Sequence, residues 1–514
     1  MNHQVRVAPS TELVDQEARQ AGQVTRHAAQ AVGQAGRGLR QLSAAAALCL
    51  WAAWTLWVAV HHEPWRDEAQ DWLLTLGRSP SEFLLNLRRE GHPPLWYLVL
   101  SCLQGLKLPL EAKAIAEWTG AAAAAALLLW RSPLGLVALA LPFGYLFGYE
   151  YPVLARPYGW TVACLLGAYH AGRTGRSATE GLCLAAAALL SAYGALLAPF
   201  VLMLRLIHGG GPLTAQKRGW PVWVPSAILA LAIAVALAIT RAPADGRYPH
   251  DAVLYFDLQR LLTTAAALSG GLLPLPQGLF CGLPCGEWDW QRFSDAPTYR
   301  LFSLLAIPVA LVALRLKHAP SAWVFCLAVA SLAGFGYVFN AGYPRHWGFV
   351  WIAFLICYRH AEEHQAPAAS RGAFRAHLVA RCILIFLALW SAIIGLATGL
   401  QEAAGLFSNA PAAAAWIEEH VPAGAPCYTD NDAKASAVIA QSGHGPMFAG
   451  NGSRWNTYVT WDRSRLATPG EIPREFQWAL ITVSAQGPPG FRLMASFDHP
   501  SATGENYWIY KRAQ

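Results

Sequence analysis

The chain has 514 residues, of which 55% are hydrophobic and 13% are charged, and its formal net charge is +7. Its mean hydropathy of +0.29 is too high for a soluble protein, and a single membrane anchor would not account for so many apolar residues. The positive charge does not indicate nucleic-acid binding, because the Lys and Arg residues lie in short clusters between apolar segments, where such clusters orient membrane proteins. The composition therefore predicts a polytopic membrane protein.

The N-terminal residues 1–41 are polar and contain Arg37 and Arg40 just before the first apolar run. This pattern predicts a cytoplasmic tail rather than a cleavable signal peptide. The apolar segments that follow are rich in Ala, Leu and Val without alternation, which favours helices over a β-barrel. About eleven membrane-spanning helices are predicted between residues 42 and 400, at 42–60, 110–130, 133–149, 157–171, 179–193, 194–208, 221–240, 299–316, 321–340, 346–358 and 378–398.

The segment from Leu95 to Leu108 is apolar, but it is only about 14 residues long and is bounded by prolines, whereas a spanning helix needs about 20 residues. We therefore predict a juxtamembrane helix at the outer interface. With the N-terminus inside, every inner loop then carries at least one Lys or Arg, as the positive-inside rule requires. This topology places the loops 61–109 and 241–298 outside the cytoplasm.

Residues 401–514 are polar and contain many glycines and prolines, and they predict a small extracytoplasmic α/β domain. A helix is expected at 411–420, and strands are expected near 458–461, 479–483 and 507–510. In the loop 241–298, Cys281 and Cys285 have the spacing of a disulfide that would form in an oxidising compartment. They are too few for a zinc site.

Asp67 and Glu68 follow the first predicted span and sit at the expected start of a short helix. On such a helix Asp67 and Asp71 share a face, while Glu68 points about 100° away. Because ionisable residues close to a membrane often mark a reactive site, Asp67 is a candidate catalytic base with Glu68 as its assistant. The alternative is that both acids only stabilise the N-terminus of the helix through its dipole.

His92 precedes two prolines, which fix an extended backbone and hold the imidazole at a defined point near the interface. It is a candidate substrate-binding residue, and its alternative role is structural. A divalent cation bound by Asp67, Glu68 and His92 is a second alternative, although a dense carboxylate cluster is missing.

Arg156 and Arg345 each lie beside a proline and an aromatic residue at an outer end of a predicted span. A guanidinium is a planar fork that suits phosphate oxygens, so the two arginines are candidates for binding an anionic ligand. The alternative is that each side chain simply reaches interfacial water or lipid phosphate. Two arginines on the same face as an acidic loop favour ligand binding.

Three motifs occur in order on the predicted outer face: the acidic pair Asp67-Glu68, the run Gly91-His92-Pro93-Pro94-Leu95-Trp96-Tyr97 and the turn Ala155-Arg156-Pro157-Tyr158. Together they resemble the GT-C superfamily of integral membrane glycosyltransferases, in particular the protein O-mannosyltransferases and the aminoarabinose transferases that modify lipid A. Trp96 stands where the family usually has a tyrosine. The resemblance covers about residues 40 to 400.

The resemblance implies sugar transfer from a polyprenyl-phosphate carrier to a lipid, glycan or protein acceptor outside the cytoplasm, by a multi-pass protein of the inner membrane. It also implies that Asp67 is the catalytic aspartate and that Arg345 and His346 lie near the carrier phosphate. His92, Arg156 and Tyr158 are the other candidate substrate-binding residues. Direct attack by the acceptor would invert the anomeric centre. Two alternatives are a transporter or flippase of a lipid-linked sugar, which predicts charged or broken helices near the midplane, and a non-catalytic membrane subunit.

Overall fold

The computed structural model describes residues 38, 41–76, 79–130, 132–154, 156–207, 222–241, 243, 252–274, 304–339, 344–365, 370–450, 454–456, 459, 471–499 and 504–513. Cys281 and Cys285 lie outside the described residues, so their pairing stays a prediction. The chain divides into two units, residues 1–50 and residues 51–514. In the first unit, the described residues 41–50 are helical. The candidate site lies entirely within the second unit.

Within the described residues, five helices are long and apolar enough to cross a membrane. They are Gln41–Ala59, α5 (Glu111–Leu129), α10 (Trp223–Thr240), α15 (Ala319–Val338) and α17 (Arg371–Ala404). Each coincides with a predicted span, and α17 extends beyond its predicted span at both ends. A helical membrane protein with several spans is thus confirmed, while the number eleven and the orientation stay predictions.

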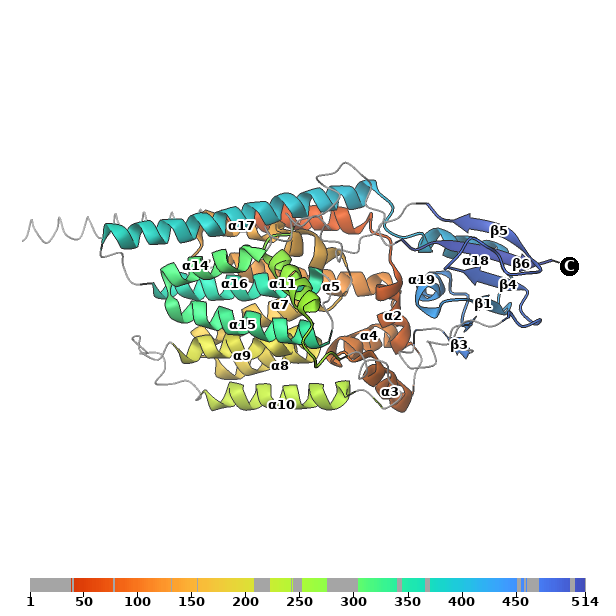
Figure 1. Ribbon diagram of the computed structural model, residues 1–514, viewed down its shortest axis with the longest axis horizontal. Helices are drawn as coiled ribbons and strands as arrows, with labels where there is room; N and C mark the ends of the chain where they lie inside the picture. The colour runs from red at the N-terminus through yellow and green to blue at the C-terminus, as the bar shows by residue number, and fades with distance from the viewer. Residues whose placement is uncertain are drawn as a thin grey trace, which may run out of the picture. The chain divides into compact units, whose positions relative to one another are not determined.

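Five other predicted spans are also helical, but they are shorter or more polar. They are α7 (Tyr158–Arg173), α8 (Ser177–Leu190), α9 (Ala192–Leu206), α14 (Ala306–Lys317) and α16 (Pro344–His364). Figure 1 shows α14, α15 and α16 running side by side. The residues of α16 from Trp347 to Tyr358 are buried, so α16 is a central helix of the bundle, with charged residues at both of its ends.

The segment 133–149 corrects the prediction, because it is not one continuous helix. It consists of two 3-10 turns, η1 (Gly135–Leu139) and η2 (Leu141–Phe143), followed by a π-helix, η3 (Leu146–Glu150). The segment lies so close to α17 that a Cβ on Gly395 would come within 2.6 Å of the Phe143 carbonyl oxygen. Ser391 of α17 accepts a hydrogen bond from the Tyr145 backbone N–H at 3.0 Å. Irregular backbone at membrane depth is tolerated where the protein satisfies its polar groups in this way.

The predicted loop 61–109 contains three short helices, α2 (Arg66–Thr75), α3 (Pro80–Glu90) and α4 (Leu95–Gly105). The side chain of Ser79 caps α3 by accepting from the Glu82 N–H at 3.3 Å, and Gly91 ends it in the left-handed conformation with φ 69°. That turn directs the chain into α4. α4 has 11 residues, which is too few to cross a bilayer.

The predicted loop 241–298 also contains a helix, α11 (Leu258–Leu272). The sequence did not predict this helix, and the position of the segment outside the cytoplasm stays a prediction. Asp257 caps the start of α11, because its carboxylate accepts from the Arg260 N–H at 3.0 Å, and α11 packs against α15 and α16. A Cβ on Gly271 would lie 2.1 Å from the Trp347 carbonyl oxygen, so a glycine is required at this close approach.

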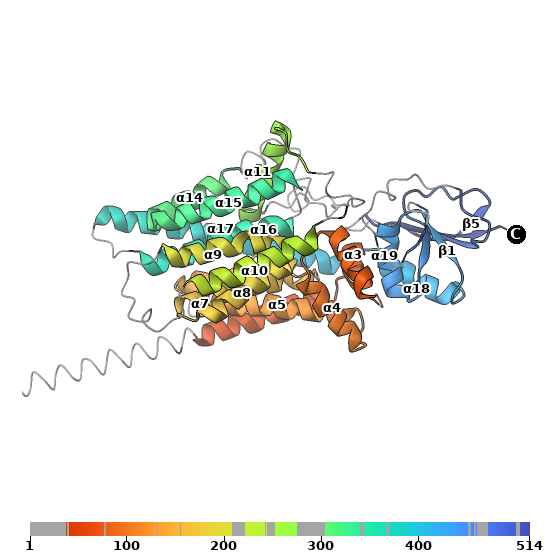
Figure 2. The same cartoon turned by 90° about the horizontal axis from the view of Figure 1, so that it is seen from below.

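The C-terminal region forms the expected α/β domain, with more elements than the sequence predicted (Figure 2). Its helices are α18 (Ala410–His420) and α19 (Asp432–Ser442), and its strands are β1 (Cys427–Thr429), β2 (Met447–Ala449), β3 (Arg454–Asn456), β4 (Trp478–Ile481), β5 (Phe491–Phe497) and β6 (Tyr507–Arg512). The sheet order is β3-β2-β1-β4-β6-β5. Strands β2, β1 and β4 are parallel, and the other pairs are antiparallel. Of the strand expected at 458–461, the structure describes Val459, which is not in a strand.

One apolar core joins α2 to this domain. Ala69, Leu73 and Leu74 of α2 belong to the same buried cluster as Ile417 of α18 and Val438 of α19. Burial of such side chains contributes roughly 1.5–3 kcal/mol for each large one. The apolar face of α2 is therefore fixed by the C-terminal domain, and its acidic face is left to the helical bundle.

Candidate active site

The acidic face of α2 meets two arginines that are distant in the sequence. Asp67 Oδ2 accepts a hydrogen bond from Arg345 Nη2 at 2.9 Å and lies 3.5 Å from Arg156 Nη2. Asp71, one turn further along α2, accepts from Arg156 Nη1 at 2.6 Å. The structure thus brings together the carboxylate and both guanidinium groups that the sequence singled out. Asp71 is an additional member.

The backbone around each arginine explains its placement. Arg156 lies in the turn just before α7, and Arg345 lies in the first turn of α16. The Tyr151 hydroxyl donates to the Arg345 carbonyl at 3.1 Å, and the Arg345 guanidinium stands over the Trp65 ring at 5.7 Å. Such cation–π contact holds the guanidinium plane without using its N–H donors.

Asp67 and Asp71 differ in their access to solvent. The Asp67 side chain is 28% exposed, while the Asp71 side chain is 2% exposed. Asp71 also accepts from the Tyr97 hydroxyl at 3.3 Å and lies 3.8 Å from Lys113 Nζ. Asp71 therefore holds Arg156 from within the protein, and Asp67 is the carboxylate of this pair that solvent can reach.

The surrounding cations keep both carboxylates ionised. Burial by itself raises the pKa of Asp67, but Arg156, Arg345 and Arg66 outweigh it and hold that pKa below its usual value. Burial likewise opposes ionisation of Asp71, and Arg156 with Lys113 reverses the effect and lowers its pKa. An opposite charge within a few ångströms favours the charged form of a carboxyl group.

Glu68 does not join Asp67. Its Oε2 lies 3.0 Å from His62 Nε2 and accepts from the Trp65 backbone N–H at 3.2 Å. His62 Nδ1 in turn lies 2.8 Å from Glu402 of α17. Glu68 is therefore part of a buried polar group that fixes the start of α2 to the end of α17.

Tyr158 and His346 lie together beside Arg345. The Tyr158 hydroxyl and His346 Nε2 are 2.9 Å apart, and the His346 ring stacks on Tyr193 at 4.9 Å between centroids. Stacking and the hydrogen bond both restrict the imidazole, so Tyr158 and His346 are held in place next to Arg345. Both predicted residues are thus adjacent to the charged cluster.

His92 lies at the edge of this group, on the link between α3 and α4. Its Nδ1 is 2.9 Å from the Glu90 carbonyl oxygen, and its side chain is 43% exposed. Glu90 itself is buried, and burial followed by repulsion from Asp71 raises its pKa to about 8 despite a hydrogen bond from Gln70. Glu90, Gln70 and Asp71 are buried, so His92 is the side chain of this group that solvent reaches.

The structure gives no support to a metal site built from Asp67, Glu68 and His92. In the part of the chain that is described, no three His, Cys, Asp or Glu side chains gather closely enough to hold a metal ion. Asp67 turns to the arginines, Glu68 turns to His62, and His92 turns to the Glu90 backbone. Positive charge near Asp67 is supplied by guanidinium groups instead.

Several members of the site were missed at the sequence level. Lys113 carried a usable signal, because it is a lone cation at the start of an apolar segment; it is 1% exposed and its Nζ donates to the Glu68 carbonyl at 2.6 Å. Arg66 precedes Asp67 directly but was not singled out. Glu505, which contacts Arg66, carries no local sequence signal.

No protein-family model matches the sequence, and no curated protein matches it in sequence. The structure is similar to the crystal structure of ArnT from Cupriavidus metallidurans bound to undecaprenyl phosphate, with a TM-score of 0.51 and 11% sequence identity; the match covers 92% of this chain and 98% of that chain. The structure of the same protein in the apo state matches with a TM-score of 0.46 and 14% identity, over 93% of this chain and 98% of that chain. The first likeness confirms the fold that the GT-C resemblance implied: the chain is built like ArnT over nearly its whole length.

Proposed function

We propose that this protein is a membrane glycosyltransferase that moves a sugar from a polyprenyl-phosphate-linked donor to an acceptor on the extracytoplasmic side of the membrane, with inversion. The observation that carries the proposal is the partly exposed carboxylate of Asp67 between the guanidinium groups of Arg156 and Arg345. The ArnT-like fold supports it, since ArnT binds undecaprenyl phosphate.

The chemistry of such a donor explains why these residue types are needed. A sugar on a lipid phosphate already has a good leaving group, so a general acid is not required. The enzyme has to stabilise the negative charge that grows on the phosphate as the glycosidic bond breaks, and it has to accept a proton from the acceptor hydroxyl. Arg156 and Arg345 provide the first function, and Asp67 provides the second.

Binding of the donor also changes the state of Asp67. Without a ligand, Arg345 donates to Asp67 at 2.9 Å. A negatively charged carrier phosphate competes for the same guanidinium groups, so Asp67 loses part of its positive surroundings and its pKa rises toward the usual value. The carboxylate then becomes a better hydrogen-bond acceptor for the incoming hydroxyl. The donor thereby prepares the base.

The surroundings of Asp67 in the described part of the chain support inversion. A double displacement needs a second accessible carboxylate at about 5 Å to serve as nucleophile or acid/base partner. Asp71 is held by Arg156 and Tyr97, and Glu68 is held by His62. We therefore assign one displacement to the site, with Asp71 orienting Arg156, Glu68 fixing α2, and His92, Tyr158 and His346 contacting the donor.

The test is a transfer assay in vesicles that contain the purified protein, with radiolabelled polyprenyl-phosphate sugars and envelope acceptors. Asp67→Asn should fold normally and transfer sugar about a thousandfold more slowly, in line with the loss of a general base. Glu82→Gln, at an exposed position of α3, is the matched control and should keep the wild-type rate. Normal transfer by Asp67→Asn would end the proposal, and movement of the lipid-linked sugar across the membrane without transfer would point to a transporter.

A further inference from the structure

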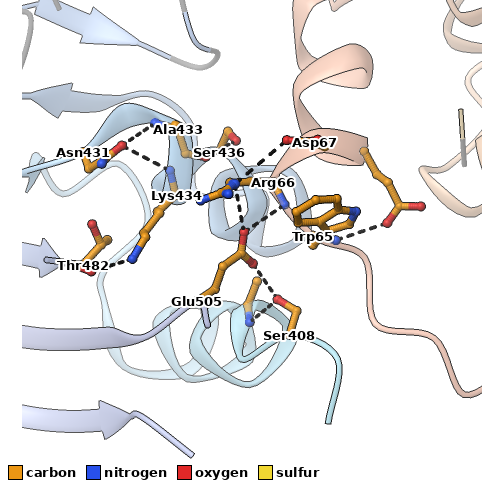
Figure 3. Close-up of polar contacts among 12 residues, drawn as sticks. Trp65, Arg66, Asp67, Ser408, Asn431, Ala433, Lys434, Ser436, Thr482 and Glu505 are labelled. Atoms are coloured by element: carbon orange, nitrogen blue, oxygen red, sulfur yellow. Dashed lines mark hydrogen bonds and ion pairs between the residues drawn. The ribbon is translucent and has the colours of Figure 1, made fainter. Parts of the chain in front are cut away.

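A buried carboxylate of the C-terminal domain holds the first turn of α2. Glu505, just before β6, is 0% exposed. Its Oε1 accepts from the Arg66 backbone N–H at 3.3 Å and lies 3.8 Å from Arg66 Nε, and its Oε2 accepts from Ser408 Oγ at 2.8 Å. Figure 3 shows these contacts between the domain and the start of α2.

Arg66 stands between two carboxylates. Its Nε is 3.8 Å from Glu505 and 3.9 Å from Asp67 Oδ1 (Figure 3). The Arg66 side chain is 33% exposed, so it can shift from one partner to the other. While Arg66 is paired with Glu505, its guanidinium cannot move closer to Asp67. Asp67 already faces Arg156 and Arg345.

We propose that Glu505 is a positioning residue for the sugar transfer: it holds Arg66 at 3.9 Å from Asp67 Oδ1, beyond hydrogen-bond distance, and so leaves that oxygen open to the acceptor hydroxyl. This inference rests on the proposed function. Through Glu505, the C-terminal domain then contributes to the arrangement of the site, in addition to any role in binding the acceptor.

Other groups near Arg66 and Glu505 also bear on the competition between Glu505 and Asp67 for Arg66. Besides Asp67 and Ser408, the described groups that act on Glu505 and Arg66 include Lys434 of α19 and Tyr507 of β6. Lys434 Nζ donates to the Thr482 carbonyl at 3.1 Å, and the Tyr507 hydroxyl donates to Glu505 at 3.3 Å. If Glu505 is neutral, Arg66 is drawn to Asp67, whose carboxylate then has a third guanidinium partner and accepts a proton less readily.

The domain has other contacts with α2, which do not depend on Glu505. Gln441 Nε2 donates to the Pro64 carbonyl at 3.0 Å. Gln70 forms two hydrogen bonds with the Val459 backbone, of 2.8 Å and 2.6 Å. Together with the shared apolar core, these contacts should keep the domain in place when Glu505 is replaced by the isosteric glutamine.

A double-mutant cycle tests the inference in the full-length protein. Glu505→Gln should lower kcat about tenfold and move the acidic limb of its pH profile to lower pH, because Asp67 gains a cation. In an Arg66→Gln background the same change should have almost no effect, because the competing cation is absent. An equal loss of rate in both backgrounds, or no loss in either, would overturn the inference.

Asp430→Asn is the matched control. Asp430 is an acid at the same edge of the sheet, and it accepts from the Thr482 N–H at 2.9 Å and the Val483 N–H at 3.1 Å. Its loss should weaken the domain without moving the pH profile. A shift equal to that of Glu505→Gln would show that the profile reports only a loosened domain, which would also overturn the inference.

Hydrogen exchange separates this inference from the proposed function, because it needs no substrate. Glu505→Ala should speed amide exchange in residues 66–71 about tenfold, and Asp430→Asn should leave it unchanged. If the wild-type protein transfers no sugar, the proposed function is wrong. If amide exchange in Glu505→Ala is unchanged, Glu505 does not hold the first turn of α2 and the inference is wrong.

Discussion

The two ends of α16 both carry buried charges, but they pair these charges differently. At the Arg345 end, Asp67 is shared by Arg345 and Arg156, and Arg156 is shared by Asp67 and Asp71. At the other end, about 30 Å away by helix length, Glu363 accepts from Arg173 and from the Tyr169 hydroxyl, each at 2.7 Å.

Neighbouring helices at the Glu363 end are tied by further ion pairs. Lys317 of α14 binds Glu362 of α16 and donates to Gln365 at 2.9 Å. Arg205 of α9 binds Glu180 of α8 and donates to Ser177 at 3.1 Å. Each of these contacts joins the end of one helix to the end of another, so the charges at this end stabilise the bundle.

The Arg345 end keeps unused bonding capacity. Within the described structure, Arg156 Nε and Asp71 Oδ2 are buried without a hydrogen-bond partner, although Lys113 lies 3.8 Å from Asp71 Oδ2. Unmet polar atoms are costly in a protein interior, and Asp67 remains partly exposed. We therefore propose that the charges at the Glu363 end serve stability and that the charges at the Arg345 end serve to bind a ligand.

The largest expected effect is on stability at the Glu363 end. Arg205→Met leaves Glu180, which is 1% exposed, as a buried carboxylate without its cation. Breaking a buried ion pair in this way costs about 3–5 kcal/mol. Thermal unfolding in detergent should show a much lower Tm, while the transfer rate per folded molecule stays near wild type. A large loss of kcat at unchanged Tm would contradict a stabilising role for the charges at the Glu363 end.

A smaller effect is expected at the Arg345 end, mainly on activity rather than on stability. Arg345→Gln should lower kcat/KM for transfer about fiftyfold, because a guanidinium that stabilises the leaving phosphate is lost. Its Tm should fall less than that of Arg205→Met, because Asp67 is partly exposed and keeps Arg156 as a partner. Arg345→Lys should recover only part of the rate, since an ammonium lacks the planar fork. Equal rates for the glutamine variant and the wild type would show that Arg345 only neutralises Asp67.

The smallest effect, taken over one pH unit, concerns the pH dependence of stability through His62. Burial lowers the pKa of His62, but Glu68 and Glu402 outweigh it and raise that pKa to about 10. A raised pKa in the folded state means that the stabilisation is complete below the unfolded value of about 6.5 and is lost as the pH rises toward 10. The unfolding free energy should fall with pH in that window, by no more than about 1.4 kcal/mol for each pH unit.

His62→Gln isolates this contribution. The variant should be less stable at pH 7, and its Tm should depend less on pH between 7 and 9 than the wild-type Tm does. Activity at the Arg345 end should change little, because Glu68 does not contact Asp67. Parallel Tm curves for the two proteins would contradict the assigned pairing of His62.

The sequence predicted the helical membrane fold and much of the candidate site, because these depend on local patterns. Runs of apolar residues located ten of the described helices, and the spacing of Asp67 and Asp71 placed them on one face of α2. The break at 133–149 escaped prediction because it depends on close contact with α17 at Gly395. The helix α11 escaped prediction because its apolar face is completed only by packing on α15 and α16.

The pairing of charges was only partly predictable. The order of motifs suggested that Asp67, Arg156 and Arg345 share a face, and helix geometry predicted that Asp67 and Glu68 point about 100° apart. Nothing local showed what each of these two directions faces. In the folded chain, Asp67 faces α16 and the turn before α7, and Glu68 faces His62 and Glu402.

Apolar segments that can form membrane helices, and the charged groups that interrupt them, are visible in the sequence alone, because hydrophobic burial and helix periodicity act over short stretches of chain. Which charges meet depends on the tertiary structure. Asp67 and Arg345 are 278 residues apart, and Arg66 and Glu505 are 439 residues apart. Contacts over such separations depend on how the helices and the C-terminal sheet pack, and packing is a property of the whole fold.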